Sequence, residues 1–301
     1  MKNNRLKILS VVLIYALFAL GSGSSGSNAS NVSSNSESST STDTSKKQED
    51  TDKLPSIEES IIFDEEGITI SAKEVVDETF FGQGIKLLIE NNSSSDVIVS
   101  SDAMAINGYM VSDMIYEKIS AGAKAYTTAN CLNSDLENAG ISQIKEADIW
   151  FNLTDPDTYK YLYKADSPAV IKTSAYEDAD SSLDIDGAEV VDQKGVRIFV
   201  KYVDENSFWG TSVLIYAENN SGRNISLTAD NVSVNGFMIN GYFYSDIKDG
   251  YKAFDTMTLF SSELKENGIE KIENIKMTFN AYDSDSYNTI FETDYVSVDV
   301  E

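Results

Sequence analysis

The segment GITISAKEVV at residues 67–76 and the segment GVRIFVKYVD at residues 195–204 open two copies of one pattern. The second copy follows the first at a constant offset of 128 residues, and no gap is needed to maintain it. The same offset relates three further pairs of segments: ENNS at 90–93 and 218–221, NGYM at 107–110 and NGFM at 235–238, and DPDTY at 155–159 and DSDSY at 283–287. A duplication of roughly 105 to 110 residues is too long for a solenoid repeat and has the size of one domain. The sequence therefore predicts two copies of one module.

The apolar pattern inside each copy is typical of β-strands. Apolar residues alternate with polar ones at Ile68, Ile70 and Ala72, while long helical periodicity is absent. Frequent Gly and Asn-Gly signals break the pattern into short segments. The strands predicted for the first copy are 67–76, 84–91, 96–106, 109–119, 123–131, 145–153 and 160–173. Seven strands in one copy suit an antiparallel sandwich, so we expect an all-β protein of two tandem Ig-like antiparallel β-sandwiches, each with one short helix.

Local signals place the turns and the helix. Asn107-Gly108 and its counterpart Asn235-Gly236 favour type I′ turns, which need positive φ at both central residues. Ser134 and Ser262 are predicted N-caps of single helical turns over 135–138 and 263–266, closed by Gly140 and Gly268. We expect this short helix to cross between the two sheets of each sandwich.

Segment composition predicts the domain organisation. Residues 1–21 read as a signal peptide, with a basic start and an apolar run from Ile8 to Leu20 that is too short to span a bilayer as a helix. We expect cleavage before Ser22, and a retained signal anchor is the alternative. Residues 22–60 are a Ser/Thr/Gly-rich tether with too few apolar side chains to fold. The first Ig-like module is expected at 61–174, a linker at 175–193 and the second module at 194–301.

The amino-acid composition limits the classes of partner that we expect the protein to bind. The formal net charge of −26 argues against binding to nucleic acid, and the acids are scattered as on a surface that keeps an exported protein soluble. Contact with a membrane is expected only through the N-terminal segment, if it is not cleaved. We therefore expect an exported protein that is extracellular or attached to the cell surface.

The chain lacks the residues on which common catalytic devices depend. It has no histidine and one cysteine, so Ser-His-Asp and Cys-His arrangements and the usual zinc sites are missing. No Gly-rich phosphate loop is present. Cys131 corresponds to Leu259 in the second copy, which predicts a buried structural thiol. We expect no enzymatic activity, and a hydrolase based on paired carboxylates is the remaining enzymatic alternative.

Two kinds of candidate site follow from the repeated motifs. Alternate carboxylates at Asp155, Asp157, Asp283 and Asp285 suggest calcium, the only cofactor that the sequence indicates, although a β-turn with Asp side chains bound to backbone amides is the simpler interpretation. Bulky residues beside the Asn-Gly turns are candidate ligand contacts, or else core plugs beneath the hairpins. These are Tyr109, Met110, Phe237 and Met238. Trp150 lies on the opposite sheet face from the core residue Phe151, where an exposed ring would stack on a sugar, although packing on a partly covered sheet is the simpler interpretation.

The N-G-[YF]-M motif, the AGAKA segment at 121–125 with DGYKA at 249–253, and the S-x-L-x-x-x-G-I segments carry a resemblance. With the signal and spacer, the chain resembles uncharacterised exported tandem Ig-like proteins of Gram-positive, clostridia-like bacteria. Its N-terminus is similar to that of surface lipoproteins, but Ala19-Leu20-Gly21-Ser22-Gly23 lacks the cysteine that carries the lipid. The resemblance implies an Ig-like sandwich and no particular activity.

These features together predict a non-enzymatic secreted or cell-surface protein whose duplicated modules bind a protein or an extracellular ligand. The alternative is a carbohydrate-binding accessory protein, which would show a row of exposed aromatic residues on one sheet face. A carboxylate-dependent hydrolase would instead show two acids facing each other across a cleft.

Overall fold

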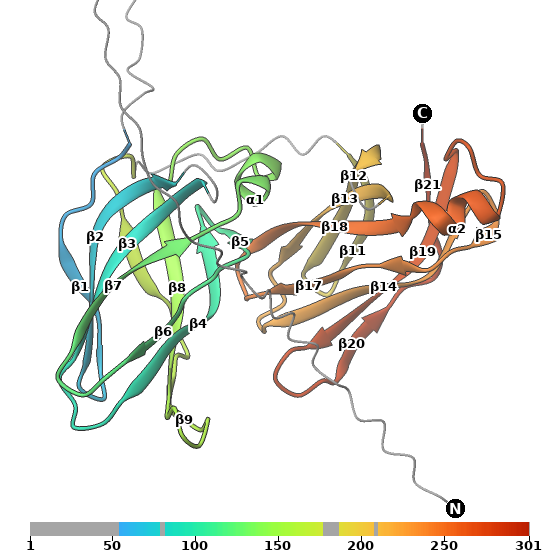
Figure 1. The fold of residues 1–301 in the computed structure, drawn as a ribbon. Helices are drawn as coiled ribbons and strands as arrows, with labels where there is room; N and C mark the ends of the chain where they lie inside the picture. Colours follow the sequence, from blue (N-terminus) through green and yellow to red (C-terminus); the bar gives the residue numbers. More distant parts are fainter. Residues whose placement is uncertain (1–53, 79–81, 177–186, 208–209, 301) are drawn as a thin grey trace, which may run out of the picture. The chain divides into compact units, whose positions relative to one another are not determined.

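The computed structural model describes residues 54–78, 82–176, 187–207 and 210–300 (Figure 1). The predicted signal peptide and the tether up to residue 53 lie outside these residues. In the described part of the chain, no helix has the length and apolar character needed to cross a membrane.

The described chain is nearly all β, as the sequence predicts. The first repeat contains β1 (Ser60–Glu65), β2 (Ile68–Glu78), β3 (Gly82–Asn91), β4 (Val97–Ile106), β5 (Tyr109–Val111), β6 (Tyr116–Ile119), β7 (Lys124–Asn130), α1 (Asn133–Asn138), β8 (Glu146–Thr154), β9 (Tyr161–Lys164) and β10 (Ala169–Lys172). The second repeat contains β11 (Ala188–Gln193), β12 (Val196–Ser207), β13 (Gly210–Asn219), β14 (Ile225–Val234), β15 (Phe237–Met238), β16 (Gly241–Tyr242), β17 (Tyr244–Ile247), β18 (Lys252–Phe260), α2 (Ser261–Glu266), β19 (Asn274–Asp283), β20 (Thr289–Glu292) and β21 (Val296–Asp299).

The 128-residue offset holds in three dimensions. The pairs β1 and β11, β3 and β13, β4 and β14, and α1 and α2 begin and end at equivalent positions of the two repeats. Equivalent sequence patterns have therefore produced equivalent elements.

Each repeat folds as two sheets around an apolar core. In the first repeat, the sheet β1-β2-β3-β7 faces the sheet built from β10, β8 and β4, and side chains such as Ile70, Ile89 and Phe151 fill the space between them. In the second repeat, β11-β12-β13-β18 face the sheet built from β14, β19 and β20, with Ile215 and Phe279 in the core. Pairing within each repeat is antiparallel, as in the β-sandwich class that the sequence predicts.

A single strand contact joins a sheet of the first repeat to a sheet of the second. The short strand β5 pairs with the start of β18, with Tyr109 opposite Lys252 and Met110 opposite Ala253. This is the one parallel pairing among the described strands. It makes one 11-stranded sheet whose main path is β10-β8-β4-β5-β18-β13-β12-β11, while β6, β9 and β16 pair with β4, β8 and β18 beside this path. The contact places residues of both repeats side by side, and the candidate site forms there.

The predicted Asn-Gly turns are confirmed, whereas the predicted N-cap residues of the two helices are wrong. Asn107 and Gly108 have φ values of 51° and 82°, and the chain reverses there from β4 to β5. The helices α1 and α2 connect the two sheets of their sandwiches, as predicted. Both helices begin earlier than expected, with Leu132 and Phe260 at the N-cap and no side-chain hydrogen bond there, so Ser134 and Ser262 are not caps. In the second repeat, the last residue of β18, Phe260, is itself the N-cap of α2, so the strand runs directly into the helix and this overrides the capping signal.

Two first strands fall in segments that the sequence assigned differently. The strand β11 lies within the expected linker 175–193, where it pairs with β12. In the first repeat, β1 begins at Ser60 and residues 54–59 also belong to the fold, since Ile57 forms a bridge with Thr173. These strands lie at sheet edges, so they show weak alternation: every side chain of β1 is exposed or half-buried. The predicted strands 109–119 and 160–173 are each divided in two.

A buried asparagine anchors the same loop in both repeats. The Nδ2 atom of Asn219 donates to the carbonyl oxygens of Arg223 and Ile247, each at 2.8 Å, while its Oδ1 atom accepts from the backbone and side chain of Ser221. Asn91 makes the equivalent bonds in the first repeat. Each amide satisfies backbone groups that would otherwise be buried without partners, which explains why ENNS recurs.

Candidate functional site

Two of the predicted ligand contacts, Tyr109 and Trp150, pack against aromatic residues of the second repeat. Tyr109 is 4% exposed, and its ring stacks on that of Phe254 with the centroids 5.7 Å apart. Trp150 is also 4% exposed, because Tyr251 packs edge-on against it at 5.3 Å and Lys248 lies over its ring. Trp150 is therefore covered rather than exposed, as in the simpler of the two interpretations, and its ring lies on the sheet face opposite to the core. Tertiary packing covers that face.

The residues equivalent to Tyr109 and Met110 are exposed in the second repeat. Phe237 is 48% exposed and Met238 is 63% exposed, in β15. The same motif thus buries its aromatic residue in one repeat and presents it to solvent in the other.

Polar contacts accompany the aromatic ones between the repeats. The Nζ atom of Lys248 lies 2.8 Å from the Oδ2 atom of Asp102, and the hydroxyl of Tyr251 donates to Asp148 over 3.0 Å. Although burial opposes the effect, Lys248 holds the pKa of Asp102 below its ordinary value. Burial raises the pKa of Asp148 to about 6.

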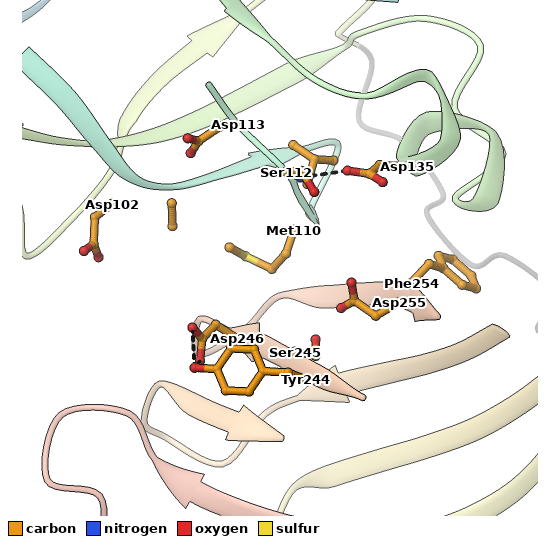
Figure 2. Close-up of a pocket in the computed structure, with 12 residues that line it drawn as sticks. Asp102, Met110, Ser112, Asp113, Asp135, Tyr244, Ser245, Asp246, Phe254 and Asp255 are labelled. Carbon is orange, nitrogen blue, oxygen red and sulfur yellow. Dashed lines mark hydrogen bonds between the residues drawn. The ribbon is translucent and has the colours of Figure 1, made fainter. Parts of the chain in front are cut away.

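A cavity of about 260 Å³ opens beside these contacts, and both repeats line it (Figure 2). The first repeat contributes residues from β4, β5, α1 and the segment after β5, and the second repeat contributes residues from β17 and β18. The lining residues are Asp102, Ala103, Met110, Val111, Ser112, Asp113, Asp135, Tyr244, Ser245, Asp246, Phe254 and Asp255. Five of these twelve residues are acidic and none is basic. We call this cavity the acidic pocket.

Two carboxylates of the acidic pocket, those of Asp113 and Asp135, accept hydrogen bonds from other residues of the first repeat. The backbone N–H of Ser112 donates to the Oδ2 atom of Asp135 over 2.7 Å, and Ser101 donates to Asp113. Burial raises the pKa of Asp113. Figure 2 shows the carboxylates of Asp113 and Asp135 on the first-repeat side of the pocket.

The second repeat supplies Asp246 and Asp255 from the opposite side. Asp246 accepts hydrogen bonds from the hydroxyls of Tyr244 and Ser226. Burial raises the pKa of Asp255 to about 6, and the negative charges of Asp135 and Asp246 act in the same direction. Carboxylates of the two repeats thus influence one another electrostatically across the pocket.

Comparison of the two repeats shows which pocket residues have the same role in both, and so belong to the shared framework of the fold, and which are particular to one repeat. Asp135 has Glu263 as its counterpart, and Glu263 binds the backbone N–H of Asn240 just as Asp135 binds that of Ser112. In contrast, the residues equivalent to Ser245, Asp246 and Asp255 are Glu117, Lys118 and Thr127. The sandwich fold does not need the second-repeat acids of the pocket, since the first repeat folds without them.

A second cavity of about 230 Å³ shares Asp102, Met110 and Asp246 with the acidic pocket. Lys164 and Lys248 also line it, and so does Asp285, which was predicted as a calcium ligand. Of the predicted site residues, Met110 lines both cavities.

The predicted calcium loops hold their first aspartates in turns. The Oδ1 atom of Asp155 accepts from the backbone N–H groups of Asp157 and Thr158, and Asp283 is bound in the same way by the loop that contains Asp285. The hydrogen bond from the Thr158 backbone is the main reason that the pKa of Asp155 is low. In the described part of the chain, no group of three or more His, Cys, Asp or Glu side chains is placed to hold a metal ion. These contacts are those of the simpler, β-turn interpretation, and calcium binding stays a prediction.

Cys131 is buried, as predicted. Its side chain packs in the core of the first repeat and is 1% exposed, and the equivalent Leu259 is also buried. Burial raises the pKa of the thiol to about 12, so the reactive thiolate is scarce at neutral pH.

Sequence reasoning missed the acidic pocket because its residues come from separate segments of both repeats. A usable signal was present, however. Acids that appear in one repeat and not at the equivalent position of the other, such as Asp246 and Asp255, depart from the shared framework. Such departures mark positions that the common fold does not explain.

Comparisons with known proteins assign the chain to no family. No protein-family model matches the chain, and no curated protein does. Among solved structures, the YadV chaperone is 12% identical with a TM-score of 0.23, over 78% of this chain and 100% of that one. The SafA pilin and SafB chaperone complex of Salmonella enterica is 10% identical with a TM-score of 0.20, over 72% of this chain and 89% of that one. A protein of unknown function from Porphyromonas gingivalis is 14% identical with a TM-score of 0.20, over 78% of this chain and 90% of that one. Similarities this low carry no conclusion about the fold or the function of this chain.

Proposed function

We propose that this protein is a non-enzymatic, exported binding protein, secreted or attached to the cell surface, and that its two Ig-like repeats together form the binding site at the acidic pocket. The repeats act as scaffolds that bring loop and strand-end residues together, as sandwich domains commonly do. The ligand is a protein or another extracellular molecule.

The observation that carries the proposal is the construction of the acidic pocket. Its carboxylates come from both repeats, and the side chains of Asp113 and Asp255 are partly buried, where burial raises their pKa values. Gathering like charges in a partly buried site destabilises the folded protein, and such groups cluster at functional sites. Because the first repeat has Thr127 in place of Asp255, the carboxylate serves no purpose shared by the two folds.

A carboxylate-dependent hydrolase is the second candidate, and one observation favours it. Asp135 and Asp255 approach the pocket from opposite sides, and Asp255 has a raised pKa, as a general acid requires. The carbohydrate-binding alternative has lost Trp150, the aromatic residue on which it chiefly rested, because that ring is buried between the repeats.

A thermal-shift screen of the purified protein tests the proposed function, since a ligand that binds only the native state raises the melting temperature. The screen contains calcium, glycans, cell-wall fragments, peptides and amines. Ser112 lies at the pocket and its side chain is exposed, so Ser112→Trp places a large group at the opening. The matched control is Asn240→Trp, at the equivalent position of the second repeat.

We expect a ligand whose shift is lost in Ser112→Trp and kept in Asn240→Trp. A ligand that shifts both variants equally would place the binding site elsewhere and overturn the assignment of the pocket. Release of product from a chromogenic glycoside, abolished by Asp255→Asn, would replace the binding function with the hydrolase.

A further inference from the structure

The acidic pocket has an unbalanced charge. No lysine or arginine is among its lining residues, and Asp102 alone of its five aspartates forms an ion pair among the described residues, with Lys164 and Lys248. The carboxylates of Asp113 and Asp255 are therefore partly buried without a cationic neighbour. A bound cation would offset this repulsion.

A buried hydroxyl in the same pocket gives an independent indication of a ligand. Ser245 is 3% exposed and lines the pocket, and its Oγ atom, which lies near the carboxylate of Asp255, has no hydrogen-bond partner of good geometry. Figure 2 shows this oxygen directed from β17 toward the cavity, on the same side as Asp255. Buried polar side chains are nearly always hydrogen-bonded, so a hydroxyl left in this state has room for a partner from a ligand. The equivalent residue of the first repeat is Glu117, so the hydroxyl is not part of the framework.

We infer that the acidic pocket binds a primary ammonium group carried on an aliphatic chain. The inference rests on the proposed function and adds the chemical class of the ligand. Asp135, Asp255 and Ser245 supply acceptors for the ammonium hydrogens, while Met110 and Phe254 supply apolar surface for the chain that carries it.

The arrangement of the acceptors favours an ammonium group over a guanidinium group. Asp113, Asp135, Asp246 and Asp255 approach from four different segments on two sides of the pocket. An ammonium group is a compact charge whose three donors point in different directions, whereas guanidinium presents a flat fork that suits a single carboxylate. A volume of about 260 Å³ suits a slender chain rather than a large ring system.

Two sources can present this chemistry. One is a free aliphatic diamine or polyamine, and the other is the lysine side chain of a protein. Isothermal titration calorimetry with the purified protein at 150 mM NaCl separates them. The probes are cadaverine, spermidine, Nα-acetyl-lysine methylamide and a lysine-containing peptide, with the norleucine and arginine analogues of that peptide as comparisons.

Variants of the second-repeat residues locate the binding. In Asp255→Asn and Ser245→Ala, we expect the affinity for a primary amine to fall about tenfold or more, because charge-assisted and buried hydrogen bonds are lost. The matched control is Asp166→Asn, an exposed aspartate on the loop after β9 that changes the net charge by the same amount. Melting curves confirm that each variant is folded.

Three outcomes would overturn the inference. The first is that no primary amine binds. The second is equal binding by wild type, Asp255→Asn and Asp166→Asn, which would reflect attraction to the acidic chain as a whole. The third is that the arginine peptide binds more tightly than the lysine peptide. A ligand without an amine that is blocked by Ser112→Trp would leave the proposed function in place while removing the ammonium. A lysine peptide that binds where free diamines do not would identify a protein as the source.

Discussion

Replacing Asp255 with asparagine should stabilise the protein at neutral pH and flatten the dependence of its stability on pH. Asp255 lies in β18, where burial comes first among the causes that raise its pKa from 3.8 to about 6. Asp135 of α1 and Asp246 of β17 face it and raise the pKa further, and the neighbouring hydroxyl of Ser245 opposes them. Asparagine keeps the shape of the side chain and removes the charge.

The sign follows from linkage. Because the folded protein holds the proton of Asp255 more tightly than the unfolded chain does, this residue favours folding at low pH, and that advantage is lost as the pH rises through about 6. The separation of the two pKa values corresponds to about 3 kcal/mol at neutral pH. Between pH 5 and pH 7.5, Asp255 alone should lower the free energy of unfolding by about 1.4 kcal/mol.

Urea denaturation of wild type and Asp255→Asn at pH 5, 6, 7 and 8 measures both effects. We expect the variant to be more stable than wild type by about 1 to 3 kcal/mol at pH 7.5, and by about 1.4 kcal/mol less than that at pH 5. Asp148 also has a pKa of about 6, but it titrates in both proteins and cancels in the difference. A difference between the two proteins that does not change from pH 5 to pH 8, as expected for Asp166→Asn, would refute the reasoning.

Three further predictions concern the framework and are measured by urea denaturation. Asn219→Ala should lower the free energy of unfolding by about 3 kcal/mol because it leaves two buried carbonyl groups without their donor, whereas an effect below about 1 kcal/mol would show that water replaces the amide. Tyr109→Ala should cost about 3 kcal/mol and its equivalent Phe237→Ala about 0.5 kcal/mol, since only the first ring is buried between the repeats, and equal losses would contradict that contact. Gly108→Ala should cost about 1 kcal/mol for the backbone alone, because φ is +82° and nothing lies within 4 Å of an added Cβ, so a neutral effect would argue against the type I′ turn.

Much of each sandwich could be predicted because its signals are local. Alternation at Ile68 and Ile70 marks a half-buried strand, and Asn107-Gly108 marks a reversal of the chain. The predictions failed where an element has weak local signals, as in the exposed edge strand β1, or where a preceding strand decides how a helix starts, as at Ser262.

The candidate site was predictable only in part. Met110 was selected from the repeated motif and does line the acidic pocket, while Trp150 was assigned to the correct sheet face and yet is covered by Tyr251. The sequence could not show that cover, because the residues lie in different repeats. Asp255 carried no motif at all, and only its difference from Thr127 distinguished it.

The amino-acid sequence by itself determined the duplication, the strand-rich sandwiches, the Asn-Gly turns and the buried position of Cys131, since each depends on near neighbours in the chain or on comparison between the copies. The tertiary structure decided that β5 pairs with β18, and with that pairing it decided everything between the repeats. The burial of Tyr109 and Trp150, the exposure of Phe237 and the meeting of Asp135 with Asp255 all follow from it. The physical reason is that equivalent surfaces of two homologous repeats have different neighbours once one repeat docks against the other.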